Sequence, residues 1–256
     1  MRFDNSNIQL NNVLPQDNLK LPKELTPKLA ELVGLIIGDG HIMYNSKKRI
    51  YRLTISGDVK EDKKYFRKIL KTIFEITNRV PKIRERKVIV RGEYKGDSLE
   101  LYTNHKKFVE YLINELELTY GGDKAFKVII PTKFLDWNYS KHILKGIFES
   151  DGSLYFSRSK VMKYPSYPRL EIRTSSKRLA YQILEILNKR NYNIRIMETK
   201  YGDFKVYLSG EEMLNKWLKE VGFSNVNTIT KYKLWKKLGY YIPKITARQR
   251  RKILKG

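Results

Sequence analysis

Two aspartates, each followed by a glycine, end two similar apolar stretches of this 256-residue chain. Asp39 follows residues 32–38 and Asp151 follows residues 144–150, and each stretch is typical of an apolar helix. The carboxyl end of a helix carries partial negative charge, which disfavours an anion by roughly 0.3–1 kcal/mol. If the two helices pair in parallel, both carboxylates meet beside terminal carbonyls that lack partners. Such an oxygen-rich, negative place, without cysteine or histidine, suits a hard divalent cation such as Mg²⁺.

Glycines inside these stretches indicate how the two helices meet. A glycine within a helix costs on the order of 1 kcal/mol relative to alanine, so it needs a compensating gain. Gly34 and Gly38 lie four residues apart on one helical face, as do Gly146 and Ser150, and such faces let two helices pack backbone to backbone. We therefore expect the two helices to pack against each other. The alternative for each aspartate is a plain turn before glycine, which leaves the helical glycines unexplained.

The residues around both aspartates resemble the nine-residue motif for which the LAGLIDADG homing endonuclease family is named. Residues 32–40 match its leucine, glycine, leucine-isoleucine and final aspartate-glycine positions, with Ile37 in place of the sixth-position aspartate. Residues 144–152 match less closely, yet both copies keep the acid at the eighth position. Two copies in phase with an internal duplication are more specific than one copy alone.

The resemblance implies an α+β fold of two pseudo-two-fold-related αββαββα halves. The motif helices would pack at the interface, and an antiparallel sheet from each half would form a DNA-binding saddle. It also implies that Asp39 and Asp151 bind Mg²⁺, with the backbone carbonyls of Gly38 and Ser150 as further ligands. Members of the family with two motifs in one chain act as monomers on double-stranded DNA, cutting both strands across the minor groove and leaving short 3′ overhangs.

Basic side chains near the metal are a further expectation from the family, which commonly uses one to orient water. Lys60 and Lys177 lie just after the relevant predicted strands and are candidate catalytic residues. The register of the duplication puts Asp58 and Ser175 nearer to the expected positions. Ordinary surface lysines are therefore the alternative interpretation.

The charge balance of the chain points to a polyanionic partner. Lysine and arginine number 52 against 27 acidic residues, a formal net charge of +25. Nucleic acid is the commonest partner of such a chain, because self-repulsion destabilises an isolated, highly charged fold. There is no apolar run of about 18 residues and no signal-peptide pattern, so we expect an intracellular protein without membrane association. The absence of cysteine excludes disulfides and thiolate metal sites.

The chain repeats one order of elements: helix, hairpin, helix, hairpin, helix. The two motif aspartates are 112 residues apart, and Ile55 and Ile172, in corresponding predicted strands, are 117 apart. We expect the motif helices to be capped by Thr26 and Ser140. The predicted division is a polar N-terminal arm (1–25), a first half (26–120), a linker (121–139), a second half (140–227) and a basic C-terminal extension (228–256), which carries a short helix from Thr246.

Polar residues alternate with apolar ones along the predicted strands, which places them on the sheet face opposite the core. A two-stranded ribbon fits the major groove of DNA, where arginine can bind guanine or phosphate. An ordinary solvated face is the alternative for any one of these residues. The candidate DNA-binding residues are Arg52, Thr54, Ser56, Arg169, Glu171, Arg173, Arg195, Lys205 and Tyr207.

Together these features predict a Mg²⁺-dependent, site-specific DNA endonuclease that makes double-strand breaks in a long recognition site. One alternative is a nucleic-acid-binding protein on the same scaffold that does not cleave, such as an RNA maturase or a DNA-binding regulator. Another is a basic scaffold that coats nucleic acid without sequence preference, whose affinity would fall steeply with salt. The sequence shows no flanking protein-splicing domains, so we do not expect an intein.

Overall fold

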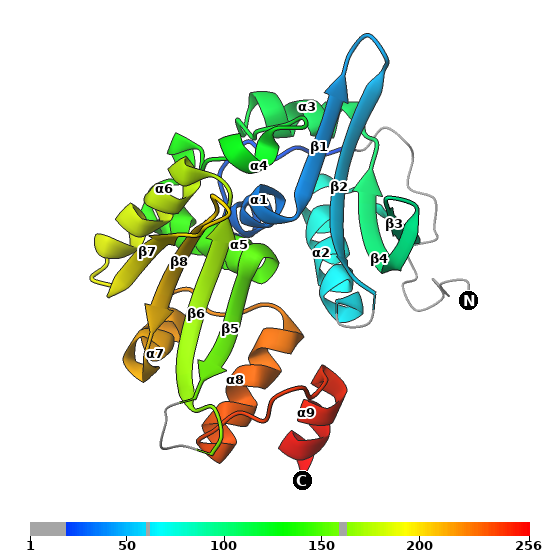
Figure 1. The fold of residues 1–256 in the computed structure, drawn as a ribbon. Coiled ribbons are helices and arrows are strands. Elements are labelled where there is room, and N and C mark those ends of the chain that lie inside the picture. The colour runs from blue at the N-terminus through cyan, green and yellow to red at the C-terminus, as the bar shows by residue number, and fades with distance from the viewer. Residues whose placement is uncertain (1–18, 60–61, 159–162) are drawn as a thin grey trace.

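The computed structural model describes residues 19–59, 62–158 and 163–256. The fold is α+β, with one four-stranded antiparallel sheet in each of two halves and helices packed against both sheets (Figure 1). Within the described residues, the order of elements in the first half recurs in the second. The predicted fold class is therefore confirmed.

The first half opens with a motif helix, continues through two hairpins separated by a helix, and closes with a short helix. Its elements are α1 (Pro27–Gly38), β1 (Gly40–Asn45), β2 (Ile50–Asp58), α2 (Lys63–Thr77), β3 (Lys82–Val90), β4 (Glu93–Thr103) and α3 (Lys106–Asn114). Thr26 caps α1 as predicted, because its hydroxyl accepts the N–H of Leu29 at 3.1 Å and Pro27 takes the first helical position.

A linker with two short helical turns leads to the second half, and two further helices follow it. The linker contains α4 (Lys124–Lys127) and the 3₁₀ helix η2 (Thr132–Phe134). The second half contains α5 (Trp137–Asp151), β5 (Gly152–Ser157), β6 (Tyr167–Thr174), α6 (Lys177–Asn188), β7 (Ile194–Glu198), β8 (Phe204–Ser209) and α7 (Glu211–Glu220). The chain ends with α8 (Val226–Leu238) and α9 (Ala247–Lys255).

The two sheets share one topology and one register. Their strand orders are β1-β2-β4-β3 and β5-β6-β8-β7. Gly40 pairs with Ile55, and Gly152 pairs with Ile172, so the glycine after each motif aspartate starts an edge strand at an equivalent position. This equivalence is the structural counterpart of the duplication seen in the sequence.

The motif helices α1 and α5 pack against each other through their glycines. A Cβ atom built on Gly34 would lie 2.1 Å from the carbonyl oxygen of Ile143, and one on Gly146 would lie 2.2 Å from that of Glu31. Gly34 meets Ile143 and Gly38 meets Ser150, so the two helices run parallel. The predicted backbone-to-backbone contact is present, and any side chain at these glycines would separate the helices.

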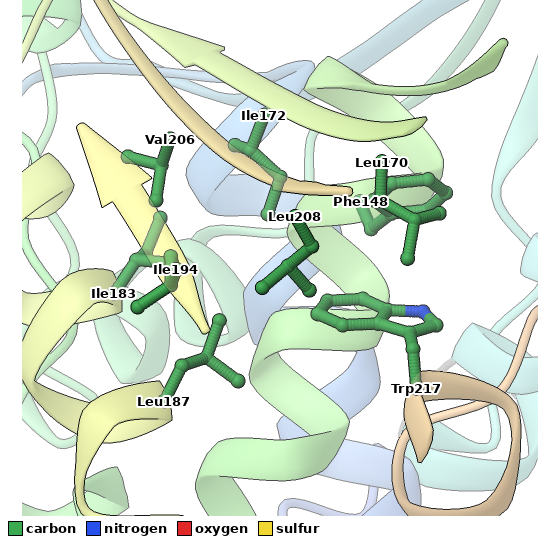
Figure 2. Close-up of a pocket in the computed structure, with 9 residues that line it drawn as sticks. All are labelled: Phe148, Leu170, Ile172, Ile183, Leu187, Ile194, Val206, Leu208 and Trp217. Atoms are coloured by element: carbon green, nitrogen blue, oxygen red, sulfur yellow. The ribbon is translucent and has the colours of Figure 1, made fainter. Parts of the chain in front are cut away.

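The apolar face of each sheet is covered by helices, which gives each half its own core. Figure 2 shows the core of the second half, where Trp217 of α7 reaches toward Phe148 of α5, with ring centroids 5.2 Å apart. Strand residues Leu170, Ile172 and Leu208 line the same space. Because Phe148 belongs to the motif helix, this core fixes α5 to its own sheet.

Two helix starts differ from the sequence-based expectation. Asp136, not Ser140, caps the second motif helix, and its carboxylate accepts the N–H of Asn138 at 2.9 Å. Aspartate caps as well as serine, and the earlier start lets Trp137 and Tyr139 pack against the core, so Ser140 becomes a buried helical residue. Helix α8 was not predicted; it is the first helix of the extension.

The N-terminal arm is described only from Leu19, since residues 1–18 lie outside the described part of the chain. Leu19, Leu21 and Leu25 pack against the core, and the hydroxyl of Tyr111 donates to the carbonyl of Pro22 at 2.9 Å. This part of the arm is therefore a strap laid on the first half. Among the described residues, no helix has the length and apolar character needed to cross a membrane.

Candidate functional site

The two motif aspartates lie at the same end of the paired helices. Asp39 is the residue that ends α1, and Asp151 is the last residue of α5. A Cβ atom on Gly38 would lie 3.0 Å from Oδ2 of Asp151, so this carboxylate lies over the last turn of α1. Asp39 keeps an exposed edge, whereas Asp151 is half-buried. The parallel packing of the helices thus brings the two acids together with Gly38 and Ser150.

Both carboxylates lie where ionisation is unfavourable. Burial raises the pKa of Asp39 to about 7, and the charges of Asp151 and Asp62 add to the rise. Burial also raises the pKa of Asp151 to about 6, although the ammonium of Lys124 opposes this shift. Two carboxylates in one partly desolvated place hold negative charge that a bound cation would neutralise.

Lys124, from the first turn of α4, provides the cation nearest to this pair. Its Nζ donates to the carbonyl oxygens of Ile36, Gly38 and Gly40, at 2.8, 2.7 and 2.6 Å respectively. Burial lowers the pKa of this ammonium to about 8, against the opposing charges of Asp151 and Asp39. Lys124 therefore binds the carbonyls that helix α1 leaves unpaired at its carboxyl end and lies between the two carboxylates.

The donor atoms of this site fit a hard divalent cation. Carboxylate and carbonyl oxygens are the ligands of Mg²⁺, which commonly takes one or two protein carboxylates and completes its shell with water and substrate phosphate. Within the described ranges, no cluster of three or more acidic, histidine or cysteine side chains has metal-binding geometry. The hydroxyl of Ser150 donates back to Gly146 and Ile147, at 3.2 and 3.0 Å, so the backbone of Ser150 is its candidate ligand.

A cleft opens beside Asp151 toward the second sheet. Lys124 and Ser175 line it, together with Arg173 and Asp203. Asp203 accepts from the guanidinium of Arg173 at 2.5 Å and from the hydroxyl of Ser175 at 2.8 Å. The candidate DNA-binding residue Arg173 is therefore held by an ion pair at the rim of the carboxylate site.

The two lysines singled out from the sequence are not brought to this cleft. Lys60 lies outside the described residues. Lys177 is the exposed first residue of α6 and is absent from the lining of the cleft, whereas Ser175 is part of that lining. Lys124 lies where a basic residue was expected, and no spacing in the sequence marked it, because the partners of its side chain are 84–88 residues away.

The polar residues of the second sheet share one face, as the register shows. Glu171 lies opposite Tyr207, which lies opposite Arg195, while Arg173 lies opposite Lys205. Lys205 and Glu171 form an ion pair at 3.0 Å. Next to them, a shallow groove is lined by Tyr167, Arg169, Asn193, Arg195, Tyr207 and Ser209.

The first sheet presents a similar face. Thr54 lies opposite Tyr102 and Ser56 opposite Glu100. The guanidinium of Arg52 lies 5.3 Å from the ring centre of Tyr102 and donates to Asn104 at 2.8 Å. All the candidate DNA-binding residues thus lie on the two polar sheet faces, at positions that alternate with buried apolar residues.

Glu100 is a residue of this face that sequence reasoning missed. It is only 5% exposed and forms ion pairs with Arg84 at 2.7 Å and with Arg86 at 3.1 Å. The two arginines come from β3, which the sequence placed in a hairpin without assigning them a role. Their alternation along one strand, at positions 84 and 86, was the available signal.

Glu149 is the acid two residues before Asp151, and it faces away from the carboxylate site. Its Oε1 accepts the N–H of Ser224, and its Oε2 is buried without a partner among the described residues. Burial raises its pKa to about 7, and the charge of Glu31 adds to the rise, while the backbone N–H groups of Ser224 and Asn225 oppose it. Glu149 is therefore protonated in the fold at pH values where it ionises in the unfolded chain.

This raised pKa predicts how stability changes with pH. Protonated Glu149 favours the fold below about pH 4.5, and this contribution is lost as pH rises through about 7, with a slope of up to about 1.4 kcal/mol per pH unit. Glu149→Gln is expected to flatten the pH dependence of the free energy of unfolding between pH 5 and 7, measured by urea denaturation. An unchanged slope in the variant would show that Glu149 does not titrate in this range.

The comparison with protein families gives the site its context. A model described as the LAGLIDADG DNA endonuclease family matches residues 30–215, which include both motif helices. The chain belongs to this family. The resemblance seen in the two nine-residue motifs is thereby confirmed, and the paired helices are the LAGLIDADG helices of this chain.

Curated relatives match over most of this LAGLIDADG chain. The replication factor C small subunit of Thermococcus kodakarensis is 28% identical over 222 residues, which are 82% of this chain and 22% of that protein. The protein of the same name from Methanocaldococcus jannaschii is 26% identical over 209 residues, which are 80% of this chain and 10% of that protein. The chain thus spans between a tenth and a quarter of the length of these relatives.

Solved structures share the fold of this LAGLIDADG chain. The homing endonuclease I-DmoI in complex with DNA and Mn is similar with a TM-score of 0.51 and 22% identity, over 77% of this chain and 97% of that one. I-WcaI bound to its DNA recognition sequence gives a TM-score of 0.50 and 20% identity, over 77% of this chain and 87% of that one. At these identities the similarity shows the fold.

Proposed function

We propose that this chain is a site-specific DNA endonuclease of the homing type, which makes double-strand breaks in a long recognition site by metal-assisted phosphodiester hydrolysis. The observation that supports this most strongly is the convergence of Asp39 and Asp151, with Lys124 between them, at one end of the glycine-packed helices. This site lies beside the polar faces of two sheets in a chain of net charge +25. The family and the fold of the DNA-bound homing endonucleases agree with it.

Each residue of the site has a role in this proposal. Asp39 and Asp151 would hold the divalent cation, preferably Mg²⁺, with the carbonyls of Gly38 and Ser150 as additional donors. When bound, the cation would supply Lewis-acid activation of the scissile phosphate and lower the pKa of water. Lys124 has a pKa near 8 and is held by three carbonyls, so its Nζ can offset phosphate charge or exchange a proton with water.

The two polar sheet faces would bind duplex DNA. Both motif helices belong to one chain and pack on each other, so the proposed enzyme is complete as a monomer. We retain the division into an arm (1–25), halves at 26–120 and 140–227, a linker (121–139) and an extension (228–256). The stretch 226–256 adds ten lysines and arginines and no acidic residue, which favours further contacts with phosphate.

The groove on the second sheet gives a prediction for salt dependence. If Arg169 and Arg195 each contact a phosphate, Arg169→Gln with Arg195→Gln lowers the slope of log affinity against log salt by about 0.9 per contact. The measurement is binding to a duplex of 30 base pairs or so by fluorescence anisotropy at several salt concentrations. Lys71→Gln is the matched control, because Lys71 is 76% exposed on α2, away from the polar sheet faces; an equal change in slope would place the DNA elsewhere.

The decisive experiment is cleavage of a randomised duplex library. The full chain is incubated with the library and Mg²⁺, and the cut ends are sequenced. A recovered long consensus with double-strand breaks supports the proposal, whereas a consensus that is bound in Mg²⁺ and in Ca²⁺ but never cut supports a binding protein on the same scaffold. Cutting or binding without any consensus would favour a basic scaffold that coats nucleic acid.

A further inference from the structure

The chain crosses from the second half to the first where it leaves α7 and enters α8. The hydroxyl of Ser224 donates to the carboxylate of Glu31, on α1, at 2.7 Å. Nζ of Lys68, on α2, donates to the same hydroxyl at 2.8 Å. The start of the C-terminal extension is therefore bonded to two helices of the first half.

Asn225, the next residue, makes a more specific contact. It is 7% exposed, and its Oδ1 accepts the N–H of Asn227 at 2.9 Å, which caps α8. Its Nδ2 donates to Oδ1 of Asp62 at 3.1 Å. One side chain thus caps a helix of the extension and bonds to the residue that precedes α2 in the other half.

Asp62 uses its carboxylate in an unusual way for its position. An aspartate before a helix commonly accepts N–H groups of the first turn, but Asp62 makes no such bond. Its Oδ2 accepts the N–H of Asp58, at the end of β2, at 2.9 Å, and its Oδ1 accepts from Asn225. The carboxylate therefore joins β2, α2 and the extension.

The other half has a corresponding connection from the linker. The residue before α6 is Ser176, and its hydroxyl donates to the carbonyl of Val128, in the linker that follows the first half, at 2.7 Å. In each half, then, the residue that precedes the helix after the first hairpin is bonded by the segment that leaves the opposite half. The recurrence shows that the contact with Asn225 belongs to the pseudo-two-fold design of the fold.

We propose that Asn225 is a positioning residue for the first-half centre, because its bond to Asp62 holds the end of β2 and the start of α2 in place beside Asp39. The inference rests on the proposed function, since it assigns Asn225 to one of two cleavage centres. Asp62 is close enough to Asp39 for its charge to raise the pKa of that carboxyl. A small displacement of a group at a reacting centre can lower a rate by up to about 100-fold.

The variant Asn225→Asp tests this role without removing the cap of α8. Aspartate accepts the N–H of Asn227 as asparagine does, but it presents a carboxylate to Asp62 in place of a donor. Hydrogen exchange of the Asp58 amide, which bonds to Asp62, is expected to become faster by on the order of tenfold. Adding Asp62→Asn to this variant restores a donor and acceptor pair at constant net charge, and is expected to restore slow exchange.

The functional readout is the ratio of the two strand-nicking rates, measured on a doubly end-labelled duplex recovered from the library. Asn225→Asp is expected to change this ratio by roughly tenfold, slowing the strand that depends more on Asp39 than on Asp151. The double variant should return the ratio toward its original value. Asn188→Asp, an exposed position on α6, adds the same charge elsewhere and should leave the ratio unchanged.

The outcomes separate this inference from the proposed function. If no library duplex is cut by the unmodified chain, the proposed function fails, and exchange at Asp58 still decides whether Asn225 positions this region. Equal slowing of both strands by Asn225→Asp, or failure of Asp62→Asn to restore the exchange rate, would overturn the inference. A tenfold change in ratio that the double variant reverses would support both.

Discussion

Asp39→Asn and Asp151→Asn are each expected to lower double-strand cleavage by roughly 100-fold or more, while duplex binding changes little. Asparagine keeps the size of the side chain but loses the charge that would hold a divalent cation, and removing one preorganised group from an active site commonly costs 10²–10³ in rate. Binding is retained because the sheet faces that carry the DNA-binding candidates are untouched. The measurement is a cleavage time course with Mg²⁺ on a supercoiled plasmid that carries the recovered site.

Nicked circles should accumulate with either variant, since each aspartate is proposed to serve one strand. Glu185→Gln makes the same chemical change at an exposed position on α6, where Glu185 pairs only with Lys189, and should cut at the normal rate. Both strands cut at an unchanged rate by either aspartate variant would disprove the mechanism. Loss of binding together with cleavage would show that these acids support the fold instead.

Gly34→Val and Gly146→Val are expected to destabilise the protein by about 3 kcal/mol or more. A Cβ atom at either position would lie within 2.2 Å of a carbonyl oxygen of the facing motif helix, and backbone cannot move aside as a flexible side chain can. The helices must therefore separate, which also exposes part of each core. Urea denaturation followed by circular dichroism measures the loss as a lower midpoint.

Gly122→Ala provides the matched control for this prediction. A Cβ atom there meets no other atom within 4 Å, and Gly122 has no positive φ, so its free energy of unfolding should change by less than about 0.5 kcal/mol. Valine tolerated at Gly34 or Gly146 with an unchanged midpoint would contradict the observed packing of the motif helices. The effect on cleavage should exceed the effect on stability, because separated helices no longer hold Asp39 beside Asp151.

The sequence predicted those features that depend on local spacing. Glycines four residues apart, with an acid at the end of each stretch, indicated the paired helices, and alternation along strands such as 51–56 indicated which residues share a sheet face. Both patterns are repeated within the chain, so each copy supports the other. The fold followed from them and from the family resemblance.

The parts that the sequence did not reveal depend on distant contacts. Lys124 binds carbonyls of α1 and β1 that are 84–88 residues away, and a single lysine in a linker has no periodicity to mark it. Helix α8 is rich in lysine, and what fixes it is Trp235, which stacks on Phe156 with ring centroids 5.5 Å apart. Asn225 is likewise explained only by Asp62, 163 residues earlier.

The reciprocal bonds from Val128 to Ser176 and from Asn225 to Asp62 bear on how such chains can be recombined. A chimaera that exchanges whole halves at a boundary in the linker would pair each half with a foreign crossing segment. Recombinants should keep residues 128–130 with the second half and residues 224–225 with the first, because each short segment completes the half to which it is bonded. Modularity in this protein therefore follows hydrogen bonding and not the linear order of the chain.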